Sequence, residues 1–261
     1  NILGAGAATT TLYPATSEPG GDDGPSFSGS QILVVQAHDV EIAGLSLDGD
    51  NPALTSGVVR NGADVDARNG IIEGDGPWDY LHVHDCTIRN IYLRALYARS
   101  GGSGFYFHQN TLDNVTGGYA SIAIFGWMAS GVIEANNVSR ANDAISANHS
   151  RGIQFLNNHI SQSSSGIHTD NNGSSGGVAD VISGNTVVDS TPGGYGIWIF
   201  FPYLNATASG NTVTNVDYSL FAWGGAGGTA TFTSNQVDGQ GRPGSIGIYV
   251  TTGPDAWATW Q

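Results

Sequence analysis

The sequence contains no lysine: all eight of its basic residues are arginine, against 22 acidic residues and a formal net charge of −14. Proteins bind nucleic-acid phosphates and anionic membrane surfaces through clustered lysine and arginine, so this charge balance argues against both kinds of partner. A mechanism that needs a lysine base or a lysine Schiff base is excluded as well. We therefore expect neither a nucleic-acid partner nor a membrane partner.

Cysteine and long apolar runs are also scarce. Cys86 is the only cysteine, so the chain cannot form an internal disulfide, and we expect a buried thiol there. The sequence has no apolar run of about 18 residues and no charged-then-apolar leader, so it predicts neither a transmembrane helix nor a signal peptide. Charged residues make up only 11% of the chain, whereas 39 of its 261 residues are glycine, which is typical of a turn-rich protein.

A short phrase of asparagine, any residue and an apolar residue recurs along the chain. Its asparagines are 22 to 27 residues apart and occupy positions Asn110, Asn136, Asn158, Asn185, Asn211 and Asn235. Short alternating segments precede the phrases, such as Phe105–Phe107, and others follow them, such as Gly196–Trp198. Three short strands per period, without any amphipathic segment of helix length, favour an all-β chain.

The repeat predicts a solenoid in which each coil of three strands stacks on the one before, about 4.8 Å away, in parallel ladders. The asparagines would then form a ladder of buried amides at one corner, where they satisfy turn backbone groups and one another. We predict about eight or nine coils in a single parallel β-helix domain that covers residues 1–261.

The Asn-x-apolar repeats, the Gly-Ile strands and the opening segment Ile2–Leu12 resemble the pectate-lyase-like right-handed parallel β-helices along nearly the whole chain. The resemblance implies that the Gly-Ile strands form the first sheet, whose outer face carries the substrate groove. Members of this family begin with extra strands and a capping amphipathic helix, so we expect the chain to be part of a longer protein. Residues 48–69 exceed a normal corner and are predicted to be a functional loop insertion that overhangs the first sheet.

Strand alternation predicts which side chains of the Gly-Ile strands point outward. If Leu96, Ile124 and their equivalents point inward, large aromatic residues flank a polar centre on the outer face. Aromatic surfaces of this extent usually bind ligands, here the apolar faces of sugar rings; the alternative is that loops, a further domain or a second subunit cover them. The candidate substrate-binding residues are Arg99, Phe125, Trp127, Trp198, Phe200, Phe221 and Trp223.

The polar centre of this face is the candidate catalytic site. His168 and Asp170 lie two apart on one strand and so leave the same face, with Asn148 beside them one coil earlier. With Asp143 as a second carboxylate, one group can protonate a leaving oxygen while the other activates water. The alternative is a set of solvated surface side chains. The candidate catalytic residues are His168, Asp170, Asp143, Asn148, His149 and Arg151.

The neighbouring sheet carries a second candidate site. His84, His108 and Glu134 occupy one register in three consecutive coils, where imidazole and carboxylate ligands suit zinc or a similar ion. Solvated side chains, or an acid and base site with Tyr106, are the alternatives. Acidic turns such as Asp22–Asp23, Asp48–Asn51 and Asp64–Asp66 offer oxygen ligands for calcium, but none has a complete calcium-loop signature.

The resemblance implies several activities, because the family includes lyases, hydrolases, epimerases and modules that only bind. An acidic glycan would be repelled by the negative chain without a bridging metal. We therefore expect a secreted or cell-surface glycoside hydrolase that binds a polysaccharide and requires no cofactor. The alternatives are a calcium-assisted lyase or uronate epimerase, and a non-catalytic glycan-binding or adhesion module. The sequence leaves the oligomeric state open.

Overall fold

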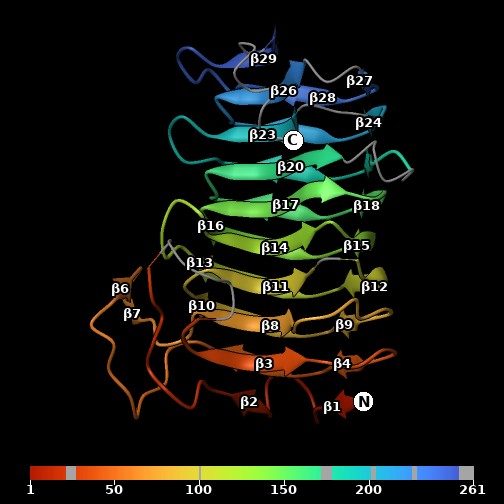
Figure 1. Cartoon of the computed structure of the whole chain (residues 1–261). Coiled ribbons are helices and arrows are strands. Elements are labelled where there is room, and N and C mark those ends of the chain that lie inside the picture. The colour runs from red at the N-terminus through yellow and green to blue at the C-terminus, as the bar shows by residue number, and fades with distance from the viewer. Residues whose placement is uncertain (22–27, 100, 172–177, 201–203, 225–227, 253–261) are drawn as a thin grey trace.

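The computed structural model describes residues 1–21, 28–99, 101–171, 178–200, 204–224 and 228–252. Every regular element in these residues is a β-strand, and all but two of the strands form three long parallel sheets, here named A, B and C (Figure 1). The all-β parallel solenoid predicted from the repeat is therefore confirmed. No helix in this part of the chain is long and apolar enough to cross a membrane.

Each sheet contains nine strands, and the chain visits the sheets in the order A, B, C once per coil. Sheet A contains β1 (Ile2–Leu3), β4 (Glu41–Ala43), β9 (His82–His84), β12 (Ser103–His108), β15 (Ser130–Glu134), β18 (Ile153–Leu156), β21 (Val181–Ser183), β24 (Ala206–Ser209) and β27 (Ala230–Thr233). Sheet B contains β2 (Thr11–Leu12), β5 (Ser46–Asp48), β10 (Thr87–Ile91), β13 (Thr111–Val115), β16 (Asn137–Ala141), β19 (His159–Ser161), β22 (Thr186–Val188), β25 (Thr212–Thr214) and β28 (Gln236–Asp238). Sheet C contains β3 (Gln31–Val35), β8 (Asn69–Glu73), β11 (Arg94–Ala98), β14 (Ile122–Trp127), β17 (Asp143–Ser150), β20 (Ser165–Asn171), β23 (Tyr195–Phe200), β26 (Tyr218–Gly224) and β29 (Ile246–Thr252).

The six repeat asparagines stack at the corner between sheets A and B, as the sequence predicts. Asn110 Nδ2 donates to Asn136 Oδ1 at 3.0 Å, and Asn136 Nδ2 donates in turn to Asn158 Oδ1 at 3.0 Å. The same side chains reach the backbone, since Asn136 Nδ2 also donates to Phe107 O at 2.9 Å and its Oδ1 accepts from the N–H of Asn110 at 3.0 Å. The residue before each asparagine turns the chain with a positive φ, for example 55° at Gln109.

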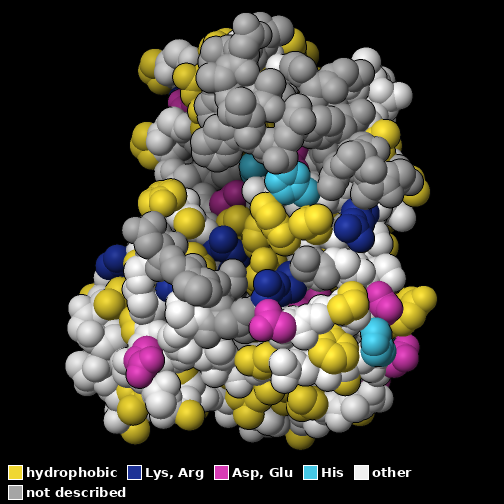
Figure 2. Space-filling view, in the orientation of Figure 1, with side chains coloured by type: hydrophobic (Ala, Val, Ile, Leu, Met, Phe, Trp, Pro, Cys, Tyr) yellow, Lys and Arg dark blue, Asp and Glu magenta, His cyan; other side chains and the backbone are white. Residues whose placement is uncertain are grey.

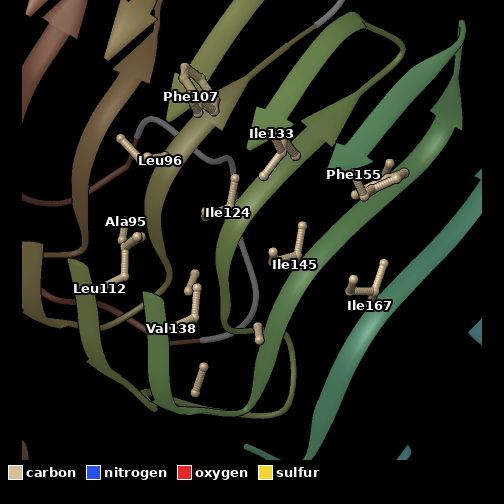
Figure 3. Close-up of a cluster of buried hydrophobic side chains, with 14 of the residues drawn as sticks. Ala95, Leu96, Phe107, Leu112, Ile124, Ile133, Val138, Ile145, Phe155 and Ile167 are labelled. Carbon is tan, nitrogen blue, oxygen red and sulfur yellow. The ribbon is translucent and has the colours of Figure 1, made fainter. Parts of the chain in front are cut away.

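Apolar side chains from equivalent positions of successive coils fill the interior between the three sheets. Leu96, Ile124, Ile145 and Ile167 are paired along sheet C and are buried against side chains from sheets A and B (Figure 3). Cys86 takes the place of the ladder asparagine in its coil, is 1% exposed, and has its pKa raised by burial. The predicted buried thiol is therefore confirmed.

The segment between β5 and β8 contains a short antiparallel hairpin of β6 (Val59–Arg60) and β7 (Ala63–Asp64). Its apolar side chains pack against Tyr92 and Leu93, and Arg60 Nη2 donates to Gly117 O at 2.9 Å. The hairpin thus lies beside the turns that lead into sheet C, at the side of the solenoid (Figure 1). The sequence predicted an insertion that overhangs the outer face of the sheet; its buried apolar residues pack against this corner.

Candidate functional site

The outer face of sheet C is the candidate functional site, and its strand register agrees with the predicted columns. One outward column runs from Tyr97 through Ser146 and His168 to Trp198, and a second pairs Trp127 with Asn148. The space-filling view shows a hollow at the level of β11 to β20, where hydrophobic, arginine, acidic and histidine side chains gather (Figure 2). The strand register therefore brings the predicted polar residues Asp143, Ser146 and His168 together on neighbouring strands of this sheet.

His168 is the centre of a compact polar cluster. Its Nδ1 atom lies 3.1 Å from Ser146 Oγ and 3.8 Å from Asp143 Oδ2. Its ring stacks on the indole of Trp198 with 4.5 Å between ring centroids. The side chains of His168 and Asp143 are 13% and 16% exposed, so the cluster is largely shielded from solvent and still reachable.

Several polar atoms of this cluster have no hydrogen-bond partner among the described residues. They are Asp143 Oδ1, Ser165 Oγ, His168 Nε2 and Trp198 Nε1, all inaccessible to solvent. Asp143 and Ser165 are direct neighbours on adjacent strands, as are His168 and Trp198. A buried polar group without a partner costs about 1–3 kcal/mol, so the gathering of four such groups distinguishes this cluster from the satisfied polar groups elsewhere in the fold.

Asp170 lies beside this cluster at an irregularity in the sheet. The ladder between β17 and β20 shifts register between Ala147 and Ser150, and His149 there has a φ of 51°. As a result the backbone N–H of His149 donates to Asp170 Oδ1. Burial raises the pKa of Asp170, while the neighbouring His168 and His149 oppose the rise, so this carboxyl holds a proton to a higher pH than an ordinary aspartate.

The same irregularity corrects the predicted neighbour of Asp170. Asn148 was expected to flank Asp170 directly, but the ladder contains no such pair, and Asn148 Oδ1 instead accepts from Ser146 Oγ at 3.2 Å. The side chain of His149 meets Trp127 edge to face at 4.9 Å. Arg151 follows the end of β17, and its Nε atom is buried without a partner in the described residues.

The predicted substrate-binding rings divide into two groups. Phe125 and Phe221 are only 5% and 4% exposed, so they are not the open stacking surfaces that the sequence predicted. Phe125 packs instead with Ile72, Tyr97 and Ile122, which together cover the part of sheet C that precedes the polar cluster. The rings that are partly accessible are Trp127, Trp198, Phe200 and Trp223.

Trp198 differs from Trp127 in what its ring can offer. Trp198 stacks on both His168 and Tyr195, so much of its ring surface already contacts protein, and its free group is the Nε1–H donor. Trp127 meets Phe125 and His149 at steep angles and is not stacked on any described ring. Trp127 is therefore the better surface for stacking a sugar ring, whereas the ring of Trp198 is largely occupied by contacts within the protein.

Two arginines lie further along the face. Arg99, a predicted binding residue, forms an ion pair with Asp75 at 3.0 Å, and its backbone N–H donates to Glu73 Oε2 at 2.7 Å. Arg94 was missed because only the two columns that follow the inward isoleucines were considered. It occupies the column of Asp143, two coils earlier, with its guanidinium carbon 4.7 Å from the centre of the Phe125 ring.

The column predicted as a metal site on sheet A is engaged in other contacts. His84 has Nδ1 2.8 Å from Asp85 Oδ2 and Nε2 3.2 Å from Glu41 Oε1, and these carboxylates raise the pKa of His84. His108 stacks on His84 at 4.7 Å, and Glu134 accepts from Tyr106 Oη at 2.5 Å. Within the described ranges no group of three or more His, Cys, Asp or Glu is arranged to hold a metal ion, so the predicted ligand set is not assembled there.

The acidic turns considered for calcium also have internal partners. Asp48 Oδ2 forms an ion pair with Arg89 at 2.7 Å, and Asp66 Oδ2 accepts from the N–H of Asn51 at 2.9 Å. Both carboxylates thus help to order the segment that follows β5. Asp22 and Asp23 lie outside the described residues.

Three parallel sheets stacked along one axis, with a polar cluster on one outer face, define a parallel β-helix protein. The model of the family described as "Right handed beta helix region" matches residues 69–237, more than half of the chain. The chain belongs to this right-handed β-helix family. No curated protein sequence matches it. The family's fold is compatible both with carbohydrate-active enzymes and with binding modules, so the choice between them depends on the chemistry of the site.

Proposed function

We propose that this protein is a secreted or cell-surface enzyme that hydrolyses glycosidic bonds of a polysaccharide bound on the outer face of sheet C. The observation that carries the proposal is the cluster of Asp143, His168 and Asp170, in which buried polar atoms lack partners beside partly accessible tryptophans. Sugars match such a surface because they present hydroxyl groups for hydrogen bonding and apolar ring faces for stacking.

The proposed chemistry assigns different tasks to the two carboxyls. Asp170 is assigned as the proton donor to the leaving glycosidic oxygen, because burial raises its pKa and it holds a proton to a higher pH than an ordinary aspartate. Asp143, whose side chain is 16% exposed and whose Oδ2 lies 3.8 Å from His168 Nδ1, is assigned to activate water or to attack the sugar carbon. His168 lies one coil after Asp143 and Ser146, with its Nδ1 atom 3.1 Å from Ser146 Oγ and 3.8 Å from Asp143 Oδ2, where it can help to position both side chains.

A second candidate function is elimination or epimerisation of a uronate, with calcium as a bridging ion. The observation that favours it is the presence of Arg94 in a strand of sheet C and of Arg151 just after the end of β17, because both reactions require a cation to neutralise the substrate carboxylate. The deficit of positive charge elsewhere in the chain favours a neutral glycan and hence hydrolysis.

One assay separates these functions. The protein is incubated with a panel of neutral and uronate-containing polysaccharides, with and without chelator, while reducing ends and the absorbance of unsaturated uronic products are followed. Reducing ends without absorbance support hydrolysis, whereas both together show elimination. Binding without either product would contradict the enzyme proposal and indicate a binding module. In the same assay, Asp238→Asn is the matched control for Asp170→Asn, because Asp238 is an exposed aspartate on sheet B, away from the cluster.

A further inference from the structure

Asp180 is a fully buried aspartate that cannot touch a substrate, yet it lies next to the proposed catalytic face. It immediately precedes β21 and is 0% exposed. Its carboxylate accepts three hydrogen bonds: from Ser150 Oγ at 2.5 Å, from Thr169 Oγ1 at 2.6 Å and from the N–H of Ile153 at 2.8 Å. A single side chain therefore connects two successive coils.

The donors to Asp180 surround Asp170. Thr169 is the residue before Asp170, and Ser150 Oγ also lies 2.9 Å from the carbonyl oxygen of Asp170. Ser150 ends the irregular stretch in which His149 adopts a positive φ and directs its N–H to the Asp170 carboxylate. Asp180 thus holds both strands that determine where the Asp170 carboxyl points.

We propose that Asp180 is a positioning residue for Asp170: by holding Ser150 and Thr169 it fixes the irregular end of β17, and with it the contact between the His149 N–H and the Asp170 carboxylate. The consequence for turnover rests on the proposed function, in which Asp170 delivers a proton to substrate. The predicted effect on the contact between the His149 N–H and the Asp170 carboxylate does not depend on that function.

The chemistry of the three donors distinguishes two substitutions at this position. Asp180→Ala removes the acceptor for all three donors, so the strands lose their common anchor. Asp180→Asn keeps an oxygen for the N–H of Ile153 and offers its amide N–H to the hydroxyls, which can accept as well as donate. The asparagine variant should therefore preserve the local geometry that the alanine variant loses.

The test has a readout that needs no substrate. In NMR spectra of the full chain, the amide proton of His149 should report its bond to a carboxylate. We expect this resonance to shift in Asp180→Ala and to return toward its wild-type position in Asp180→Asn.

A second readout uses a substrate found by the polysaccharide panel. The kcat of Asp180→Ala should fall about 100-fold with little change in KM, as expected for a misplaced catalytic group, and Asp180→Asn should recover most of the lost kcat.

Asp113→Ala is the matched control, because Asp113 also holds a hydroxyl, that of Ser139 at 2.7 Å, but on sheet B. It should lower the melting temperature while leaving the His149 resonance and kcat unchanged. If Asp180→Ala behaves in the same way, Asp180 is only structural and the inference is wrong.

Should Asp180→Ala fail to fold, Ser150→Ala and Thr169→Val each remove one donor and should each shift the His149 resonance. Absence of any turnover in the wild type would contradict the proposed function, while the NMR comparison would still decide the positioning role.

Discussion

The asparagine corner and the His168 cluster both bury polar side chains, but only the corner provides each of them with hydrogen-bond partners. At the corner, Asn136 donates two hydrogen bonds and accepts one from the preceding asparagine's backbone and one from its side chain, all between 2.9 and 3.0 Å. In the cluster, Asp143 Oδ1 and His168 Nε2 are equally inaccessible and have no partner in the described part of the chain.

This contrast separates polar groups that stabilise the fold from those that are available to a ligand. A satisfied buried network rigidifies the structure, because removing one member exposes the others to the full cost of desolvation. A cluster with unsatisfied atoms is costly to the empty protein, and that cost is offset when a ligand supplies the partners. We therefore expect substitutions at the corner to reduce stability and substitutions in the cluster to reduce activity.

The largest effect is expected in the cluster. Asp170→Asn should reduce turnover about 10²- to 10⁴-fold, because the amide keeps the shape but cannot deliver a proton. Steady-state kinetics together with a binding measurement on the same polysaccharide provide the test. Asp143→Asn should be comparably damaging if both carboxyls act in hydrolysis. Near-normal turnover in Asp170→Asn would remove this centre from the mechanism.

The largest effect on stability is expected at the corner. Asn158→Ala leaves the backbone N–H and the side-chain amide of Asn136 without their acceptor, and Ile133 O without its donor. At about 1–3 kcal/mol for each buried group left unsatisfied, the free energy of unfolding should fall by about 4 kcal/mol. Urea unfolding measures this change in the free energy of unfolding. Asn137→Ala, at an exposed position of β16, is the control and should change stability by less than about 0.5 kcal/mol. Equal effects of the two substitutions would contradict the role of the ladder.

Buried carboxyls near the ends of the sheet C strands predict a pH dependence of stability. Burial raises the pKa of Glu73 from 4.5 to about 7, and that of Asp180 from 3.8 to about 6. The folded protein then binds these protons more tightly than the unfolded chain. The stability that each protonated carboxyl contributes is therefore complete below the pKa of the unfolded chain and is lost as pH rises through the pKa of the folded protein. For Glu73, the difference between the two pKa values lowers the free energy of unfolding by about 3 kcal/mol between about pH 4 and pH 8. Unfolding of Glu73→Gln over this range should show a correspondingly smaller decline, and an unchanged decline would argue against a protonated Glu73.

The smallest expected effect concerns sugar stacking. Trp127→Ala should weaken polysaccharide binding by about 1 kcal/mol, roughly five-fold, because one stacking surface is lost. Affinity electrophoresis with the polysaccharide that binds best would measure the change. Tyr13→Ala removes another exposed ring, next to β2 and away from sheet C, and should leave binding unchanged. If both variants bind like the wild type, the aromatic face does not contact the glycan.

Some features of the site could be read from strand alternation because the ladder in sheet C keeps its register over most of its length. Ser146, His168 and Trp198 align as predicted, since each lies one residue after an inward isoleucine. Asp170 and Asn148 do not align, because the strand gains an extra residue between Ala147 and Ser150. No glycine or proline marks this irregularity in the sequence, and His149 carries the positive φ instead.

Exposure could not be predicted in the same way. Phe125 and Trp127 both point outward from β14, yet Phe125 is buried among outward side chains of neighbouring coils, whereas Trp127 stays partly open. Asp180 carried no signal that separates it from other aspartates before a strand. Its importance arises only when Ser150 and Thr169, 30 and 11 residues away in sequence, donate to its carboxylate.

By itself, the sequence determined the solenoid, because buried amides that recur at a regular interval satisfy one another and the turn backbone when they stack along parallel strands. It also determined which residues share a face, since alternation along a strand is a local property of the backbone. Only the tertiary structure decided which of those residues remain without partners, where the irregular strand turns Asp170, and which rings stay accessible. These properties depend on atoms that come together from different coils, and no local pattern along the chain records their distances.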